Sequence, residues 1–577
     1  MARLLAAVLL LSCAWPAAAA ARHPDTLTDV LIGEVTSLDP AGAYDNASQG
    51  LIYNVYETLI AYDGPRLNRF VPVLSTRVPS RRNGLISKDG RVYRFPIRKG
   101  VRFQDGSLMT PEDVRYSLMR FMLYDRAGGP SALLLQPILG ASSTRDASGK
   151  MRVSFADVEK AVRVKGGTVV ITLKRPFAPF LAIMARWSYV MSRSWAAEHG
   201  DWDGKAGDWE KYNDIDQQRS YFFAHMDGTG PFELERWDRT ANYVLLKRFD
   251  GYWRRPARLK RIVLRAEPEF STRRLMLQSG DADIIETPRP LLGQLRGLPG
   301  VRIVDHLPSL STDPALFFTF RINPLGNPDI GSGKLDGDGI PPDFFSDPDV
   351  RKGFACAMDY QALIRDTFMG AAVRAKGPVP PGVPGYDPRQ PYYRFDLKKA
   401  AEHLRKAWGG RVWREGFRFT LTYNVGSENR QAACEILKKN VESLNPKFKI
   451  DLRGVEWASF LDKAQRRLMP IFARGWYADY PDAHNFVYAF YDSDGRYPSA
   501  QGFRDPELDR LIEEAAGQLN GRRRAALYRR ILALGYKDVP SIVTVHTSEV
   551  VALRSWVRGF YRNPVFLGNY YYPLGKD

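Results

Sequence analysis

Cysteine and histidine are scarce in this chain, which has 3 cysteines and 7 histidines among 577 residues. No H-E-x-x-H motif occurs, and no histidine pair has metal-site spacing, so we predict neither a metal site nor a cofactor. A G-x-S-x-G nucleophile motif is also missing. The segment G-S-G-K-L at 331–335 is not a phosphate-binding P-loop, because Pro328 stands where the first glycine is required. A hydrolase would therefore lack an identifiable nucleophile, base and oxyanion donor.

Long apolar runs are missing as well, because no stretch after the N-terminus approaches the 18 apolar residues of a membrane-spanning helix. Residues 1–21 are predicted to be an export signal. Arg3 supplies the positive start, residues 4–11 are a short apolar segment, and the alanines at 17–21 suit cleavage. Lipid attachment at Cys13 is the alternative. We expect free export to the periplasm.

Removal of the signal would leave two cysteines, Cys356 and Cys434, and both fall in amphipathic helical patterns. An exported protein could join them in a disulfide. Cysteines on two helix faces are more often separate buried residues, so we expect them to be unpaired.

Acidic residues are outnumbered, with 64 Asp and Glu against 83 Lys and Arg, which gives a formal charge of +19. A field of this sign favours anionic partners or surfaces. Because the basic residues are scattered and the chain is predicted to be exported, we expect a solvated basic surface and no nucleic-acid partner. A negatively charged membrane face nearby is compatible with this charge.

Alternating strand and helix patterns run through the remaining sequence and predict an α/β fold. Tyr93, Phe95 and Ile97 show the period of a strand, and Thr110 with Asp113 forms the capping box of a helix. From about residue 317 the pattern becomes strand–helix–strand–helix–strand, ending in the strand M-P-I-F-A-R-G-W at 469–476. Crossovers that contain a helix predict parallel pairing of these strands.

The loop R-G-W-Y-A-D-Y-P-D-A-H-N-F, residues 474–486, follows that last buried strand. Ligands of open α/β domains sit where strands leave the sheet at their carboxyl ends. Gly475 allows close backbone approach, Trp476 and Tyr477 offer flat surfaces, and Asp479 accepts hydrogen bonds from an ammonium or hydroxyl group. A capped turn with a small aromatic core is the alternative.

Several stretches occur in an order typical of one family: S-L-D-P with V-Y-E-T-L-I, R-K-G-V-R-F-Q-D-G-S-L-M-T-P-E-D-V, G-T-G-P-F-E-L-E-R-W, L-Q-S-G-D-A-D-I, and the 474–486 loop. From about residue 28 to the C-terminus, the chain resembles the extracellular solute-binding proteins that include the dipeptide- and oligopeptide-binding proteins of ABC importers. The resemblance implies a periplasmic-binding-protein fold with two lobes. Expected ranges are 22–60, 185–315 and 545–577 for lobe I, 61–184 for a small extra domain on it, and 316–544 for lobe II. The resemblance also implies a hinge of two crossing strands, near residues 317–323 and 542–546.

The resemblance further implies a peptide-like ligand, delivered by a monomer to an ABC permease in the inner membrane. In peptide-binding relatives, the acidic residue at the position of Asp479 holds the ligand's α-ammonium group. Trp476 matches an aromatic wall, and the Gly475 and Tyr477 backbones would bond to the peptide. Arg474 could meet a ligand carboxylate, and Leu38 and Asp39 could line the cleft at the end of the first strand.

Residues 198–228 form an insert rich in Trp, Asp and Tyr, which peptide-binding relatives with a shorter loop lack. This insert could cover the rim of the cleft. An oligosaccharide is the alternative ligand, with Trp202 and Trp209 stacking on sugar rings. A metal chelate is a weaker variant, since only His484 is close to the loop. An exported hydrolase and a signalling receptor are the remaining hypotheses.

Overall fold

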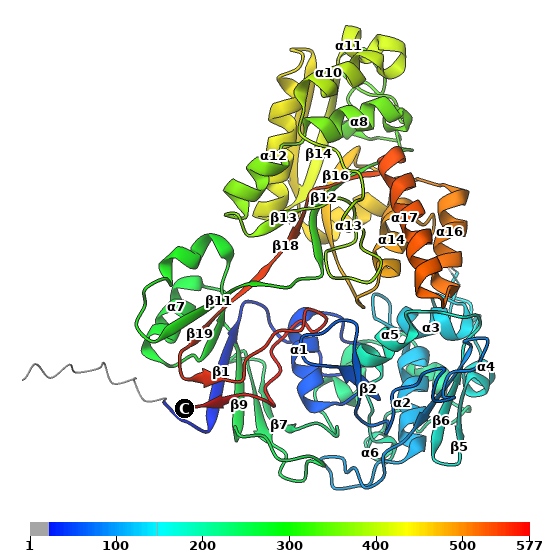
Figure 1. Ribbon diagram of the computed structural model, residues 1–577, viewed down its shortest axis with the longest axis vertical. Coiled ribbons are helices and arrows are strands. Elements are labelled where there is room, and N and C mark those ends of the chain that lie inside the picture. The colour runs from blue at the N-terminus through cyan, green and yellow to red at the C-terminus, as the bar shows by residue number, and fades with distance from the viewer. Residues whose placement is uncertain (1–21, 147) are drawn as a thin grey trace, which may run out of the picture.

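The computed structural model describes residues 22–146 and 148–577, and it confirms the α/β class. The predicted export signal with Cys13 lies outside the described residues. Within 22–146 and 148–577, no helix has the length and apolar character needed to cross a membrane. Figure 1 shows two bodies that are linked by crossing strands on one side and lie against each other on the other, and we call the lower body lobe I and the upper body lobe II.

Lobe I is built on a mixed seven-stranded sheet with the order β11-β19-β10-β1-β9-β8-β7. The central strand β1 is parallel to β9 and β10, whereas β19 near the C-terminus is antiparallel to β10 and β11. The strands are β1 (Thr26–Leu31), β7 (Phe232–Asp238), β8 (Tyr243–Arg248), β9 (Arg261–Ala266), β10 (Ile284–Glu286), β11 (Val301–Leu307) and β19 (Glu549–Arg554). The sheet therefore joins segments from both ends of the chain.

A smaller unit packs on lobe I and contains a three-stranded antiparallel sheet, β4-β6-β5. Its elements include β4 (Val92–Pro96), α2 (Pro111–Tyr124), α3 (Ala132–Leu139), α4 (Phe155–Ala161), β5 (Val162–Lys165), β6 (Thr168–Thr172) and α5 (Phe180–Trp187). The predicted capping box of α2 is confirmed, because Thr110 and Asp113 bond to each other's backbone N–H groups. The side chains of Tyr93, Phe95 and Ile97 are buried together, as their period predicted.

Lobe II is built on a five-stranded sheet with the order β15-β14-β16-β12-β17. The predicted parallel pairing is confirmed, since β14 is parallel to both β15 and β16. The strands are β12 (Ser311–Phe318), β14 (Phe417–Asn424), β15 (Phe448–Val455), β16 (Ile471–Tyr477) and β17 (Ser541–Val543). The larger helices of lobe II are α8 (Pro348–Ala357), α10 (Leu397–Lys406), α12 (Glu428–Glu442), α13 (Trp457–Gln465), α14 (Ala483–Tyr491), α16 (Pro506–Gly517) and α17 (Gly521–Asp538).

Two chain segments connect the sheets, and Figure 1 shows them in green and red between the two bodies. One runs from β11 to β12, and the other from β18 (Val545–Thr547) to β19. β12 pairs with β16 from Ser311 onward, and β18 pairs with β13 (Ala372–Arg374) of lobe II. The predicted borders at 316 and 545 therefore fall within or beside lobe II strands, and the sheets change at 308–310 and 548. We place the hinge at these two points.

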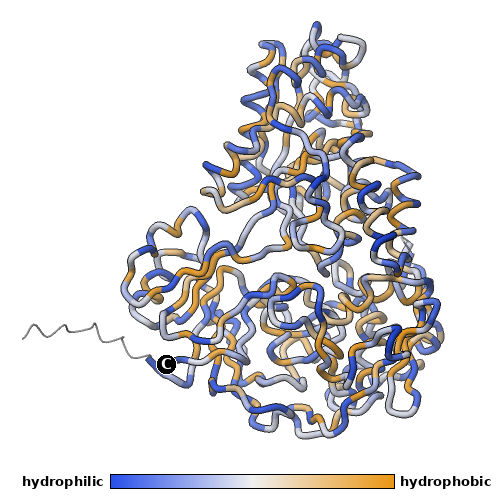
Figure 2. The backbone as a smooth tube through the Cα atoms, viewed as in Figure 1, coloured by the Kyte–Doolittle hydropathy of each residue, from blue (hydrophilic) through white to orange (hydrophobic). Residues whose placement is uncertain are grey.

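Figure 2 shows hydrophobic residues gathered along the strands of the lobe I sheet.

A buried ion network ties the small unit to this lobe. The Arg120 guanidinium on α2 donates to both carboxylate oxygens of Asp39 at 2.8 Å, and to the carboxylate of Asp201 at 3.0 and 3.1 Å. The Ser220 hydroxyl bonds to both aspartates. This network fixes residues 198–228 against the S-L-D-P turn.

Replacing Arg120 by Gln should leave two buried carboxylates without a cation. The expected loss in the free energy of unfolding is about 3–5 kcal/mol, because breaking a buried ion pair strands a desolvated charge. Chemical denaturation measures this loss. The ion pair holds the pKa of Asp39 below its ordinary 3.8 despite burial, so the pair's contribution is full above that pH and is lost as the pH falls through the lowered pKa.

Arg163→Gln is the matched control, because Arg163 is exposed on β5 of the same unit. Its stability should stay within about 0.5 kcal/mol of the wild type. Equal losses in the two variants would contradict a structural role for the network.

Candidate ligand-binding site

A cavity of about 680 Å³ lies between the two lobes. Lobe I contributes the end of β1, the segment after β10, part of β19 and residues of 562–569, while lobe II contributes the start of β12, the loop before α12 and Tyr477 at the end of β16. This volume lies within the range of about 300–1,000 Å³ typical of small-molecule sites. Its position makes the interlobe cavity the candidate site.

The end of β16 is held against β12, where Ser311 pairs with Tyr477 and Thr312 with Trp476. Gly475 is needed here, because a Cβ atom would lie 2.1 Å from Cγ of Asp313 on β12. Asp313 in turn accepts a bidentate contact from the Arg430 guanidinium, at 3.0 and 2.8 Å. Gly475 therefore allows the close packing that leaves Asp313 at the cavity wall.

Asp479 lies at a contact between the lobes. The Tyr44 hydroxyl, from the lobe I loop before α1 (Asn46–Val55), donates to Oδ1 of Asp479 at 2.5 Å. The Trp187 indole N–H donates to the Asp479 backbone carbonyl at 3.0 Å. Oδ2 receives one long contact, from Asn485 at 3.3 Å. Burial raises the pKa of Asp479 above its ordinary value, and the hydrogen bond from Tyr44 partly opposes this rise.

Trp476 and Tyr477 both have their polar atoms bonded. The Trp476 indole donates to Oδ1 of Asn485 at 2.8 Å, and its ring meets Tyr497 edge-on. The Tyr477 hydroxyl reaches lobe I, bonding to the Pro564 carbonyl at 2.7 Å and to Glu549 at 3.2 Å. Tyr477 thus lines the cavity and joins the lobes, whereas Trp476 supports the loop from lobe II.

Arg474 is a cation without a carboxylate partner among the described residues. Its guanidinium lies over the rings of Trp457 and Tyr497, at 5.1 and 5.6 Å from their centroids. Burial lowers the pKa of Arg474 from its ordinary value. Since Asp313 is already paired with Arg430, Arg474 is left with a charge that an anionic group could neutralise.

The prediction for Leu38 and Asp39 needs correction. Both side chains are completely buried in lobe I, and the Asp39 carboxylate is occupied by Arg120, Ser220 and the Ala41 N–H group. The carboxylate serves the ion network described above. Asp39 stabilises the fold, because a buried aspartate without its arginine would be strongly destabilising. Leu38 and Asp39 are therefore structural residues and do not contact a ligand.

The hypothesis that Trp202 and Trp209 stack on a ligand is also corrected. Both are buried in the hydrophobic core, and Trp202 stacks on Tyr116 with ring centroids 5.6 Å apart. His484 is buried too, with Nδ1 bonded to the Tyr480 hydroxyl at 2.8 Å and its pKa lowered by burial to about 4. Within the described parts of the chain, no three His, Cys, Asp or Glu side chains are grouped to hold a metal ion.

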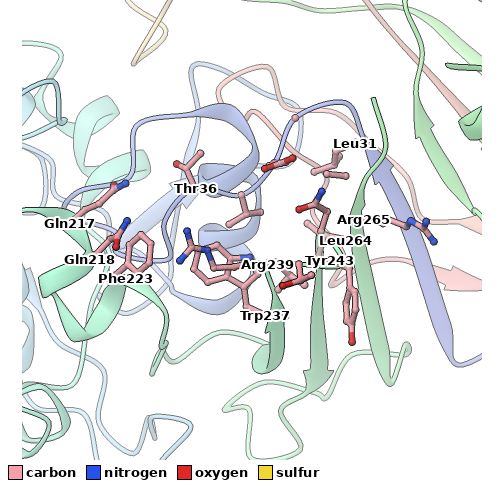
Figure 3. Close-up of a pocket in the computed structure, with 17 residues that line it drawn as sticks. Leu31, Thr36, Gln217, Gln218, Phe223, Trp237, Arg239, Tyr243, Leu264 and Arg265 are labelled. Carbon is pink, nitrogen blue, oxygen red and sulfur yellow. The ribbon is translucent and has the colours of Figure 1, made fainter. Parts of the chain in front are cut away.

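Residues 198–228 line a different cavity, of about 460 Å³, on lobe I alone. Figure 3 shows Gln217, Gln218 and Phe223 on one side of it and side chains from the lobe I sheet, among them Trp237 and Arg239, on the other. None of its lining residues belongs to lobe II. The segment contributes no residue to the lining of the interlobe cavity, whose rim we had considered that it could cover.

Sequence reasoning missed several residues that build the site. Tyr44 and Asn485 hold the Asp479 carboxylate, Asp313 lies at the wall, and Glu549 pairs with Arg562 at 2.7 Å beside Tyr477. The aromatic and polar segment at 560–572 was a signal that could have pointed to the Arg562 region. Tyr44 had no signal, because its partner lies 435 residues away.

Comparisons with known proteins agree with this architecture. The family model described as "Bacterial extracellular solute-binding proteins, family 5 Middle" matches residues 70–498. The oligopeptide-binding protein OppA of Bacillus subtilis is 26% identical over 520 residues, which cover 88% of this chain and 85% of OppA. The dipeptide-binding protein of Escherichia coli is 24% identical, covering 83% of this chain and 82% of its own length.

Solved structures show the same fold. HbpA2 from Haemophilus parasuis aligns with a TM-score of 0.71 at 23% identity, covering 96% of this chain and all (100%) of that one. DppA from Helicobacter pylori, solved in complex with the peptide STSA, aligns with a TM-score of 0.70 at 22% identity, covering 96% and 98%. Because the family model matches more than half of the sequence, the chain belongs to the bacterial extracellular solute-binding proteins of family 5.

Proposed function

We propose that this protein is the substrate-binding component of an ABC importer and captures a peptide-like solute between its lobes. The protein binds the solute and does not convert it. It is exported to the periplasm, works as a monomer and delivers the solute to a permease in the inner membrane. Relatives named as oligopeptide- and dipeptide-binding proteins support this ligand class.

The observation that carries the proposal is the Asp479 carboxylate between the lobes. Oδ1 is held by Tyr44, whereas Oδ2 has one long contact, so it retains capacity to accept a strong hydrogen bond. The α-ammonium group of a peptide would supply that donor and neutralise the charge of this half-buried carboxylate. Ligand contact with Asp479 would thus stabilise the state in which Tyr44 and Asp479 meet, which is the closed one.

Arg474 and the end of β16 extend the site from this anchor. The unpaired guanidinium of Arg474 suits a carboxylate of the ligand, and an extended peptide can add main-chain hydrogen bonds beside β16. The positive charge of Arg474 on β16 and the negative charge of Asp479 in the following loop favour a zwitterionic ligand over a neutral one.

Asp479→Asn should weaken binding of short peptides with a free amino group by about 10- to 100-fold. The reason is the loss of a charge-assisted hydrogen bond that contributes about 1.5–3 kcal/mol. Isothermal titration calorimetry measures the affinity, and the thermal midpoint should change little. N-acetylated peptides should bind weakly to the wild type and lose nothing further in the variant.

Asp494→Asn is the matched control, because Asp494 is exposed in the same lobe. It should leave peptide affinity unchanged. Equal affinity of Asp479→Asn and the wild type for free-amino peptides would contradict the anchor role.

Tyr44→Phe should make peptide binding more sensitive to acid. Only the ionised carboxylate attracts an ammonium group, so affinity falls as the pH drops through the pKa of Asp479 in the unliganded protein. The Tyr44 hydroxyl stabilises the ionised form and lowers this pKa. Without the hydroxyl the pKa rises, and the fall in affinity should begin at higher pH.

Calorimetric titrations from neutral to acidic pH measure this shift. Tyr243→Phe on β8, remote from the Asp479 contact, should retain the wild-type profile. An identical pH profile for Tyr44→Phe would show that Tyr44 does not hold the Asp479 charge.

A further inference from the structure

A second cavity, of about 230 Å³, lies within lobe I and its small unit, apart from the interlobe cavity. Its lining comes from 53–73, Tyr189, Arg254 and 561–570, and lobe II contributes no residue. Seven of the lining side chains are aromatic. We call it the aromatic pocket; Gly568 in its lining also lines the interlobe cavity.

The aromatic walls are ordered by stacking. Tyr53 stacks on Phe566 and on Tyr570, with ring centroids 4.7 and 5.5 Å apart, and Tyr62 meets Phe566 edge-on. A cavity of about 150 Å³ lined by apolar groups is enough to hold benzene. The aromatic pocket therefore has room for one substituted ring, which its walls would contact face and edge.

Several hydrogen-bond donors at the pocket have no acceptor among the described residues. Arg254 lies over the Trp253 ring, 4.4 Å from its centroid, and forms no ion pair with a described residue. The hydroxyl groups of Tyr561 and Tyr570 have no hydrogen-bond partner in the described chain. The Tyr189 oxygen accepts from Arg186, so its own hydrogen remains free to donate.

Arg186 adds a second cation behind the wall. Its side chain is only 1% exposed, it lies over the Trp187 and Phe566 rings at 4.6 and 5.2 Å, and it pairs with no carboxylate of the described chain. An unpaired buried guanidinium is costly, and an anion nearby would reduce that cost.

Glu57 is the acidic residue in the lining, and it is already satisfied. Its carboxylate accepts hydrogen bonds from Tyr252 at 2.8 Å, Trp253 at 2.7 Å and Thr229 at 3.1 Å. Three donors stabilise this charge without a ligand cation. Arg254 is near enough to lower the pKa of Glu57, but neither cation forms an ion pair with a described residue.

We propose that the aromatic pocket is a second binding site, which takes a small aromatic carboxylate of the hydroxybenzoate type. The ring packs against Tyr53 and Phe566, and the carboxylate accepts from Arg254 and the neighbouring tyrosine hydroxyls. This site goes beyond the proposed peptide site and does not require it.

Calorimetry of the mature protein with 4-hydroxybenzoate tests the proposal. Saturable binding is expected, and Arg254→Gln should weaken it about tenfold or more through loss of a charge-assisted hydrogen bond. Arg255→Gln is the matched control, because Arg255 is the next residue, is exposed and does not line the pocket. It should bind 4-hydroxybenzoate as the wild type does.

Two further measurements keep the outcome decisive. Asp479→Asn should bind 4-hydroxybenzoate normally, whereas a loss equal to that of Arg254→Gln would place the compound in the interlobe cavity and overturn the proposal. Benzyltrimethylammonium, a ring of opposite charge, should bind more weakly than 4-hydroxybenzoate, and tighter binding of this cation would also overturn it. If Arg254→Gln fails to fold, Tyr561→Phe takes its place and should weaken binding several-fold.

No saturable binding of 4-hydroxybenzoate at millimolar concentration would end the proposal.

Discussion

A carboxylate held between two bodies needs hydrogen-bond donors, and at the half-buried Asp479 both lobes supply them. Asp479 leaves the sheet of lobe II, yet its shortest hydrogen bond comes from Tyr44 of lobe I. Trp187, also outside lobe II, holds the backbone carbonyl of the same residue. The donors that stabilise Asp479 are therefore complete only while the lobes touch. If the lobes separated, the Asp479 carboxylate would lose the Tyr44 hydrogen bond and would be free to bond to water or to a solute.

The fold delivers Asp479 to this position through a short chain of close contacts. β12 begins directly after one crossing between the lobes and pairs with β16, so the end of β16 is fixed relative to that crossing. Gly475 lets Asp313 pack against that strand end, and Arg430 holds Asp313 in place. Tyr477 then reaches the Pro564 carbonyl across the gap. A small rotation at 308–310 and 548 would break the contact between Tyr477 and Pro564, whereas the contacts of Asp313 within lobe II would be kept.

Local patterns in the sequence were sufficient to predict the strand before the loop at 474–486, the parallel order of β14, β15 and β16, and the cap of α2. The strand and the cap depend on residues within a few positions of one another, and the parallel order follows from the helices that connect the strands. Leu38 and Asp39 could not be placed in the same way, because the partner that explains Asp39 is Arg120, 81 residues away. Trp202 and Trp209 looked like exposed platforms, but long-range packing on α2 buries them. Of the residues predicted from their position after a strand, Tyr477 lines the interlobe cavity, whereas Arg474, Gly475, Trp476 and Asp479 lie outside its lining and stay predictions. The contact of Tyr44 with Asp479 required the tertiary structure.

The thiols of Cys356 and Cys434 are both free and buried, and burial raises the pKa of each. Thiols of this kind are poor nucleophiles, since reactivity requires the thiolate. Folding of residues 22–577 thus needs no oxidant, and synthesis in a reducing compartment is compatible with the native structure. Because the native thiols are buried and unreactive, a thiol-reactive dye would label cysteines introduced on the surfaces of the two lobes in preference to them. Energy transfer between two such dyes would then report changes in the distance between the lobes.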